Sequence, residues 1–234
     1  MKKLLFILLL LSGHLLNAQS RHQQYADLSV AAGNGFSPAL SYNYLWGIGK
    51  KGKFKIGTGV RLTYFAAQHK DFITAPARLT SGQTGPQVLF VENILANLDT
   101  LHLAKSGVFY LNIPIHLQYS FSQKFEIGFN IDAIGLSFGK EQTGTFEASN
   151  SATLNGSQQS AKPTVFNLLL VSDNDLGSLN SELYFRYWFS KNIGLRAGAS
   201  FQFIEYRTNR LLTLENDRFR SKNLLPMLAV SFKF

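Results

Sequence analysis

The chain contains no cysteine among its 234 residues. Disulfide bonds, on which small secreted domains often depend, are therefore excluded as a source of stability. A lipid anchor attached through a cysteine is excluded for the same reason. The folded state must be held together by non-covalent interactions.

Long apolar runs are also absent, except near the start of the chain. Two lysines precede an unbroken apolar run at residues 4–11, and Ala18 offers a small residue for cleavage. This pattern predicts a secretory signal peptide over residues 1–18, whose core is too short to span a bilayer as a helix. Residues 19–234 are predicted to form one domain, and they contain no run near the ~20 apolar residues that a membrane helix needs. If this domain crosses a membrane, it must do so with strands.

Acidic residues are few: the chain has 14 of them and 23 lysines and arginines, which gives a formal net charge of +9. Loss of the signal peptide would remove Lys2 and Lys3 and no acid, so nine less two leaves +7 for the remaining domain. A basic exported protein can meet nucleic acid, acidic polysaccharide or anionic lipid, but charge specifies a partner only weakly. We expect the excess charge on exposed loops and turns, and no nucleic-acid partner.

Helical periodicity is scarce, whereas apolar residues recur at every second position along much of the chain. In the clearest segment, Ile56, Val60 and Leu62 share one face and Arg61 lies on the other. Near Ala133 the alternation slips by one residue, which predicts a β-bulge. The alternation predicts eight strands, at residues 25–33, 39–48, 54–66, 108–121, 125–138, 182–189, 193–203 and 223–234.

The connections between these strands alternate in length. Those after the second, fourth and sixth strands have a few residues, whereas residues 68–106 and 139–177 are long polar stretches. Short turns at one end and long loops at the other are typical of a bacterial outer-membrane barrel. The expected fold class is an all-β, antiparallel transmembrane β-barrel of eight strands, with short periplasmic turns and long extracellular loops. Its last strand is expected to pair with its first.

Two other architectures are compatible with the alternation. A soluble β-sandwich would show the same alternation with its apolar face turned inward. Against it, the polar faces hold few lysines and glutamates and many glycines, which suit a narrow, crowded interior. A ten-stranded barrel stays open, because residues 86–95 and 164–171 are apolar segments within the long polar stretches. We expect these segments to extend strands above the membrane, with an extra hairpin or a docking edge as the other options.

Two sets of residues are candidates for particular roles in such a barrel. The first is a candidate interior charge network in which opposite charges on the polar faces pair with one another: Lys55, Arg61, Glu126, Asp132, Glu182, Arg186 and Arg196. The second is an aromatic girdle near the short turns, because membrane interfaces favour aromatic rings. Its members are Trp46, Tyr119, Phe121, Tyr187, Phe189, Phe232 and Phe234.

The segment "YLNIPIHLQYSF", Tyr110–Phe121, resembles the Tyr-Leu-Glu-Ile-Pro-Leu signature of the PorT-like outer-membrane β-barrel family. The order of signal peptide, eight strands, proline-bearing middle strand and aromatic end is similar to that family over nearly the whole chain, as it is to small OmpX/OmpA-like barrels. The chain departs from the signature at Asn112, where an acidic residue is more usual. The resemblance implies an envelope protein, with secretion-system assembly as one role among relatives. It also implies that the barrel-assembly machinery recognises Phe234 as a C-terminal aromatic residue.

Candidate chemistry is sparse. The histidines form no spaced metal motif, so no catalytic residue, metal site or cofactor is expected. His116 and Ser120 share a strand face, but about 13 Å, at ~3.3 Å per residue, is too far for a nucleophile–base hydrogen bond. His116 is expected to be an interior hydrogen-bonding residue.

Three functions are therefore compared. The favoured one is a non-enzymatic barrel in the outer membrane of a Gram-negative bacterium, with a structural or partner-binding role. Its expected partners are outer-membrane lipids, the barrel-assembly machinery and other envelope proteins. The alternative is a narrow pore for ions or small solutes, which eight strands disfavour because side chains fill so small an interior. A lipid-modifying enzyme is the third.

Overall fold

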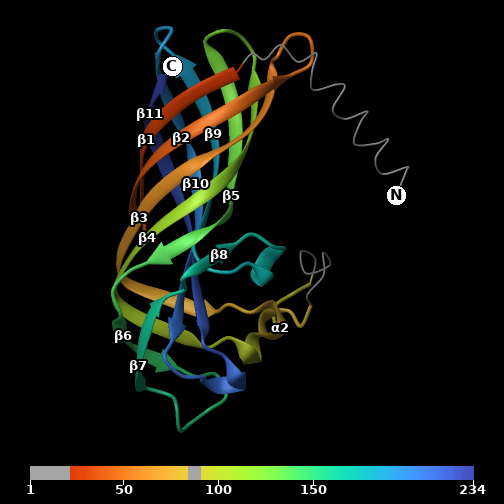
Figure 1. Cartoon of the computed structure of the whole chain (residues 1–234). Helices are drawn as coiled ribbons and strands as arrows, with labels where there is room; N and C mark the ends of the chain where they lie inside the picture. The colour runs from red at the N-terminus through yellow and green to blue at the C-terminus, as the bar shows by residue number, and fades with distance from the viewer. Residues whose placement is uncertain (1–21, 84–90) are drawn as a thin grey trace, which may run out of the picture.

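The computed structural model describes residues 22–83 and 91–234, so the predicted signal peptide lies outside the described residues. The fold is almost entirely antiparallel strands (Figure 1). The strands are β1 (His22–Ala32), β2 (Phe36–Ile48), β3 (Phe54–Thr74), β4 (Thr100–Ser120), β5 (Phe125–Phe138), β6 (Gln142–Glu147), β7 (Ser157–Pro163), β8 (Phe166–Leu168), β9 (Leu179–Trp188), β10 (Ile193–Thr208) and β11 (Arg218–Lys233). The helical turns are α2 (Ala77–Thr80), η2 (Leu95–Asn97), η3 (Ser172–Asn174) and η4 (Thr213–Glu215). None of the helices in the described ranges is long and apolar enough to span a membrane.

Eight of the strands close into a ring. Its order is β1, β2, β3, β4, β5, β9, β10 and β11, and every neighbouring pair is antiparallel. The ring closes where β11 pairs with β1, with Lys233 opposite Tyr25 and Met227 opposite Ala31. The predicted eight-stranded barrel and its closing strand are therefore confirmed. A closed ring leaves no unpaired edge over the length of these ladders.

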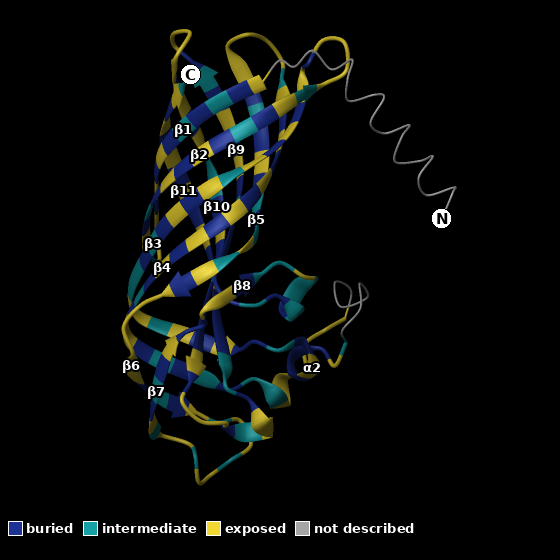
Figure 2. Ribbon diagram, viewed as in Figure 1, coloured by how far each residue is buried: buried dark blue, intermediate teal, exposed yellow. Residues whose placement is uncertain are grey.

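The two faces of the ring differ in chemistry. Along β11, Leu224 and Leu228 point outward and are 67% and 60% exposed, whereas Asn223 and Ser231 point inward and are fully buried. The same banding of buried and exposed residues runs along each strand of the ring (Figure 2). Because side chains alternate across a strand, the sequence pattern alone fixes which residues share a face. The ring thus turns its apolar side outward and its polar side toward the axis.

The predicted bulge is present in β5. Ile113 pairs with Ile134 and Pro114 with Asp132, so Ala133 is the extra residue without a partner. Proline lacks the amide donor that a regular ladder needs, and strands tolerate it at bulges. The bulge explains why the outward positions of β5 change from odd to even numbers after Ala133.

Glycines on the inner face match the expected crowding. A Cβ atom at Gly128 would lie 2.3 Å from the ring of Tyr184, and one at Gly198 would lie 2.1 Å from the Leu183 carbonyl oxygen. Such separations are far below van der Waals contact. Any larger residue at these positions would displace the neighbouring strand or its side chains.

A second ring extends the barrel at the end opposite the short turns. β3, β4, β10 and β11 continue beyond the eight-stranded ring, and the β6–β7 hairpin fills the gap between β4 and β10. β11 then pairs directly with β3 through Phe219 and Arg220. The result is a six-stranded ring, visible as the lower part of Figure 1. The expectation that residues 68–106 and 139–177 form long loops, with strand extension at residues 86–95 and 164–171, was wrong, because strands occupy much of both stretches outside those two segments.

The six-stranded ring reverses the polarity of the eight-stranded one. On β3 the inward positions change from Arg61 and Thr63 to Phe65 and Phe72, all of them buried. The interior of this ring is an apolar core whose members include Phe72, Leu101, Leu103, Phe146, Ala161, Tyr206 and Phe219. It is therefore packed like a water-soluble protein.

The two apolar segments at residues 86–95 and 164–171 were expected to extend ring strands, and that expectation was wrong for their described part, which neither continues a ring strand nor adds one to the ring. Of residues 86–95, the described part is coil leading into η2. Within 164–171, β8 pairs with β5 at Ile134–Leu136, beyond the last β5–β9 pair at Ile131. β8 thus occupies the edge of β5 that β9 leaves free, and the ring keeps eight strands. The extra hairpin, β6–β7, instead comes from polar sequence.

Candidate functional site

A chain of ion pairs runs through the interior of the eight-stranded ring. Lys55 pairs with Glu126 at 3.1 Å, and Glu126 with Arg186 at 3.3 Å. Asp27 lies between Arg186 and Arg196, at 3.2 and 3.1 Å. We call the complete set the charge ladder, in order Lys55, Glu126, Arg186, Asp27, Arg196, Glu182, Arg61 and Asp132.

The ladder brings together all seven residues of the candidate interior charge network and adds Asp27. The missing member had a signal in the sequence, because Asp27 alternates with the outward residues Ala26 and Leu28. It lies on β1, whereas its arginine partners lie on β9 and β10. Only closure of the ring brings these three strands to one side of the axis.

The ladder is electrically balanced, with four cations and four anions that are all at most 8% exposed. Neutral groups complete it. Asn130 accepts a hydrogen bond from Arg61 at 2.8 Å, and the Ser231 hydroxyl donates to Asp27 at 2.5 Å. The Arg186 guanidinium also lies 4.0 Å from the centre of the Tyr25 ring. Buried charges that are paired and hydrogen-bonded in this way avoid the large cost of desolvation without a partner.

His116 and Ser120 are not hydrogen-bonded to each other. His116 is 2% exposed on β4, and neither of its ring nitrogens is hydrogen-bonded to a described residue. The interior position is as expected, but the expected hydrogen bonding was wrong. The Ser120 hydroxyl contacts Lys55 at 2.8 Å and Glu126 at 3.1 Å instead. Among residues 22–83 and 91–234, no three histidine or acidic side chains are grouped to hold a metal ion.

The residues of the predicted aromatic girdle point outward near the short turns. Tyr187 is half-buried and the other six are exposed. The rings contact one another, with centroids 5.2 Å apart for Tyr119 and Phe121 and 5.1 Å apart for Tyr187 and Phe189. Phe234 reaches Tyr42 on β2, with ring centroids 6.3 Å apart. These contacts form a band on the outside of the barrel.

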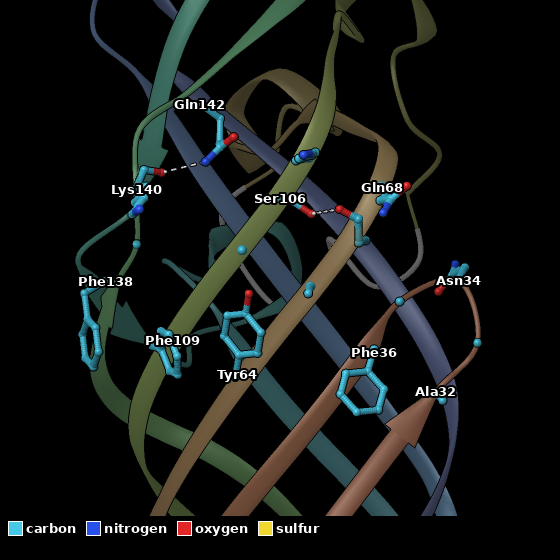
Figure 3. A pocket seen from close by; sticks show the side chains of 17 residues that line it. Ala32, Asn34, Phe36, Tyr64, Gln68, Ser106, Phe109, Phe138, Lys140 and Gln142 are labelled. Atoms are coloured by element: carbon cyan, nitrogen blue, oxygen red, sulfur yellow. Dashed lines mark hydrogen bonds between the residues drawn. The ribbon is translucent and has the colours of Figure 1, made fainter.

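A second aromatic row lies where the two rings meet. It borders an open hollow of about 1120 Å³ on the outer surface, which we call the junction hollow. Figure 3 shows Phe36, Tyr64, Phe109 and Phe138 along its lower side, with Gln68, Lys140 and Gln142 above. Tyr64 and Phe109 lie 4.4 Å apart between ring centroids. The hollow thus changes from apolar to polar along the barrel axis.

An exposed histidine links three strands of the six-stranded ring. His102 on β4 contacts Asp71 on β3 at 2.7 Å through Nδ1 and Glu147 on β6 at 2.9 Å through Nε2. Hydrogen bonds to Glu147 and then Asp71 raise the pKa of His102 above its usual value. The protonated ring can donate to both carboxylates at once.

Comparisons with known proteins match the chain to solved barrels at low identity. Neisserial surface protein A is 12% identical over 91% of this chain and 96% of that one, with a TM-score of 0.40. The N-terminal β-barrel domain of Pseudomonas aeruginosa OprF is 12% identical over 92% and 100%, with a TM-score of 0.37. Ail of Yersinia pestis is 9% identical over 92% and 97%, with a TM-score of 0.34. No protein-family model matches the chain, and no curated protein matches it.

Proposed function

We propose that this protein is a non-enzymatic, integral outer-membrane β-barrel of a Gram-negative bacterium, with a structural or partner-binding role in the envelope. The observation that carries the proposal is that the eight-stranded ring has a continuous apolar outer face and an interior filled by a neutral network of paired charges. Apolar side chains exposed around a whole ring are unfavourable in water and favourable in hydrocarbon. A closed ring also satisfies its backbone hydrogen bonds internally, as a bilayer requires.

The dimensions of the outer face support this placement. On β3, Phe54 lies opposite Tyr119 of the aromatic band near the short turns, and Tyr64 lies in the row at the junction hollow. Ten residue steps at ~3.3 Å and a tilt of about 45° give an apolar band about 23 Å tall, close to the ~25 Å of known barrels. The aromatic rows at its two edges would then lie at the two membrane interfaces. The six-stranded ring, with its apolar interior, would stand in water outside the cell.

The filled interior supports a role other than a pore. The charge ladder crosses the lumen with direct side-chain contacts from Lys55 to Asp132. An ion would have to break several buried pairs to pass. Steady single-channel currents in planar bilayers would favour the narrow pore, whereas the absence of currents from folded, inserted protein is the expected result.

The finer proposal is a role in secretion-system assembly, as in PorT-like proteins. It is supported by the resemblance at Tyr110–Phe121, which contains the strand segment with the bulge-associated Pro114. It is tested in the native bacterium by deleting the gene and measuring exported proteins by mass spectrometry. Unchanged export with normal envelope integrity would contradict it.

Membrane insertion has its own test. Cells expressing the chain are fractionated, and the outer-membrane fraction is run on gels with and without boiling. A folded barrel should be extracted only with detergent and should change its electrophoretic mobility on heating. Recovery of the folded protein from aqueous extracts would contradict the proposal.

A further inference from the structure

Among the described residues, the excess positive charge is confined to one end. Among residues 22–83 and 91–234, the charge ladder is neutral, and ten basic and ten acidic residues lie in and around the six-stranded ring. Within the part of the chain that the structure describes, the short-turn end has no acidic side chain outside the ladder. It holds six lysines: Lys50, Lys51, Lys53, Lys124, Lys191 and Lys233. Each of the three short turns of the ring carries at least one of them.

Four of these lysines line a hollow at the end of the barrel. Its volume is about 570 Å³, and we call it the short-turn mouth. Lys51, Lys53, Lys191 and Lys233 line its rim, and Lys55 lies at its inner end. The mouth is blind, because the charge ladder begins at Lys55 and fills the lumen beyond it.

The mouth has little negative charge of its own. Glu126 is its only acidic lining residue, and Lys55 and Arg186 already pair with that carboxylate. Lys233 places its Nζ 5.3 Å from the Trp188 ring, a contact that holds the ammonium group over the lining. A concave surface lined by charge of one sign concentrates the field and attracts the opposite charge.

We propose that the short-turn mouth binds an acidic polypeptide segment of another envelope protein. The inference rests on the proposed membrane placement, which puts this end in the periplasm. Anionic lipid headgroups are the other source of negative charge there. They fit the mouth less well, because the aromatic rings on the outside of the wall mark the side that faces lipid and the mouth opens on the barrel axis.

The test uses the full mature chain, folded in nanodiscs of zwitterionic lipid, and a fluorescein-labelled octaglutamate peptide as the probe. Binding is measured by fluorescence anisotropy at low and high salt. The mouth variant carries Lys51→Gln, Lys53→Gln and Lys191→Gln. The matched control carries Lys70→Gln, Lys105→Gln and Lys140→Gln at the other end, with the same change in net charge. Heat-dependent gel mobility verifies that both variants are folded.

The wild-type chain should bind the peptide in a salt-dependent manner, because exposed charge pairs are screened. The mouth variant should weaken binding about tenfold, because three exposed charge pairs with the peptide are lost, and the control should weaken it less than twofold. No binding, or equal losses in both variants, would overturn the proposal. Loss of peptide binding when the nanodiscs contain anionic phosphatidylglycerol would indicate that the lysines bind lipid headgroups. That result would also overturn the proposal. Failure of the chain to insert into nanodiscs would instead contradict the membrane placement.

Discussion

Asp27 and Arg186 are separated by 159 positions in the sequence, yet the carboxylate of one meets the guanidinium of the other at 3.2 Å inside the barrel. Both side chains are completely buried. Asp27 also pairs with Arg196, so a single carboxylate separates two buried cations. The interior of the ring is therefore stabilised by a chain of mutually dependent charges.

Replacement of Asp27 by asparagine should strongly destabilise the barrel. The change leaves Arg186 and Arg196 facing each other without the shared anion, and breaking a buried pair in this way costs about 3–5 kcal/mol. The free energy of unfolding can be measured by tryptophan fluorescence in urea with the protein in detergent micelles. Glu92→Gln is a suitable control, because Glu92 is exposed, and it should change stability by less than ~0.5 kcal/mol. Equal stability of the two variants would show that the ladder is not needed for folding.

Replacement of Leu228 by arginine tests which side of the ring meets lipid. Leu228 is outward and 60% exposed near the middle of the outer face of β11. A cation at the bilayer midplane should make folding into vesicles less favourable by about 2–4 kcal/mol. Gln68→Arg, beyond the aromatic row, is the matched control and should have little effect. If Leu228→Arg left the free energy of folding unchanged, this result would argue against a lipid-facing outer surface.

Replacement of Phe146 by alanine should loosen the six-stranded ring while the eight-stranded ring stays intact. Phe146 is fully buried on β6 and packs edge-on against Phe219, with ring centroids 5.8 Å apart. Loss of a buried phenylalanine side chain costs about 3–5 kcal/mol in a packed core. Hydrogen exchange with mass spectrometry should show faster exchange in β6 and β7 and unchanged exchange in β1 and β2. Thr143→Ala, on the exposed side of β6, serves as the control, and uniform acceleration across both rings would contradict separate cores.

The contact between His102 and its two carboxylates should make the six-stranded ring sensitive to pH. Its pKa is raised in the folded state, chiefly by hydrogen bonds to Glu147 and Asp71. The stabilisation is therefore fully present below the unfolded pKa of about 6.5 and is lost as pH rises through the folded value. Hydrogen exchange in β6 should be slower at pH 6 than at pH 8, after correction for intrinsic rates. This difference in exchange rate should vanish in His102→Gln. If it persists in that variant, another group causes the pH dependence.

Several features of the fold followed from the sequence because they depend on local periodicity. A strand places successive side chains on opposite faces, so the outward residues of β11 and the inward position of Arg61 could be assigned without a structure. The bulge at Ala133 was detectable for the same reason, since an extra residue shifts the phase of the alternation. Short turns also fixed the antiparallel order of neighbouring strands.

Other features escaped sequence reasoning because they depend on contacts between distant segments. The β6–β7 hairpin is built from polar residues without a clear alternation, and it is held by ladders to β4 and β10. The six-stranded ring could not be inferred from the sequences of β4 and β10, the two strands that flank the hairpin. The inward position of Asp27 could be inferred from the alternation, but its partners could not, because they lie on β9 and β10, far away in the sequence.

The sequence by itself determined which face of each strand is apolar, because that depends only on an alternation of period two. The tertiary structure decided which charges meet in the lumen, where the polarity reverses between the two rings, and that four lysines from different strands and turns line one opening. Those outcomes depend on ring closure and register, which bring together residues that no local pattern connects.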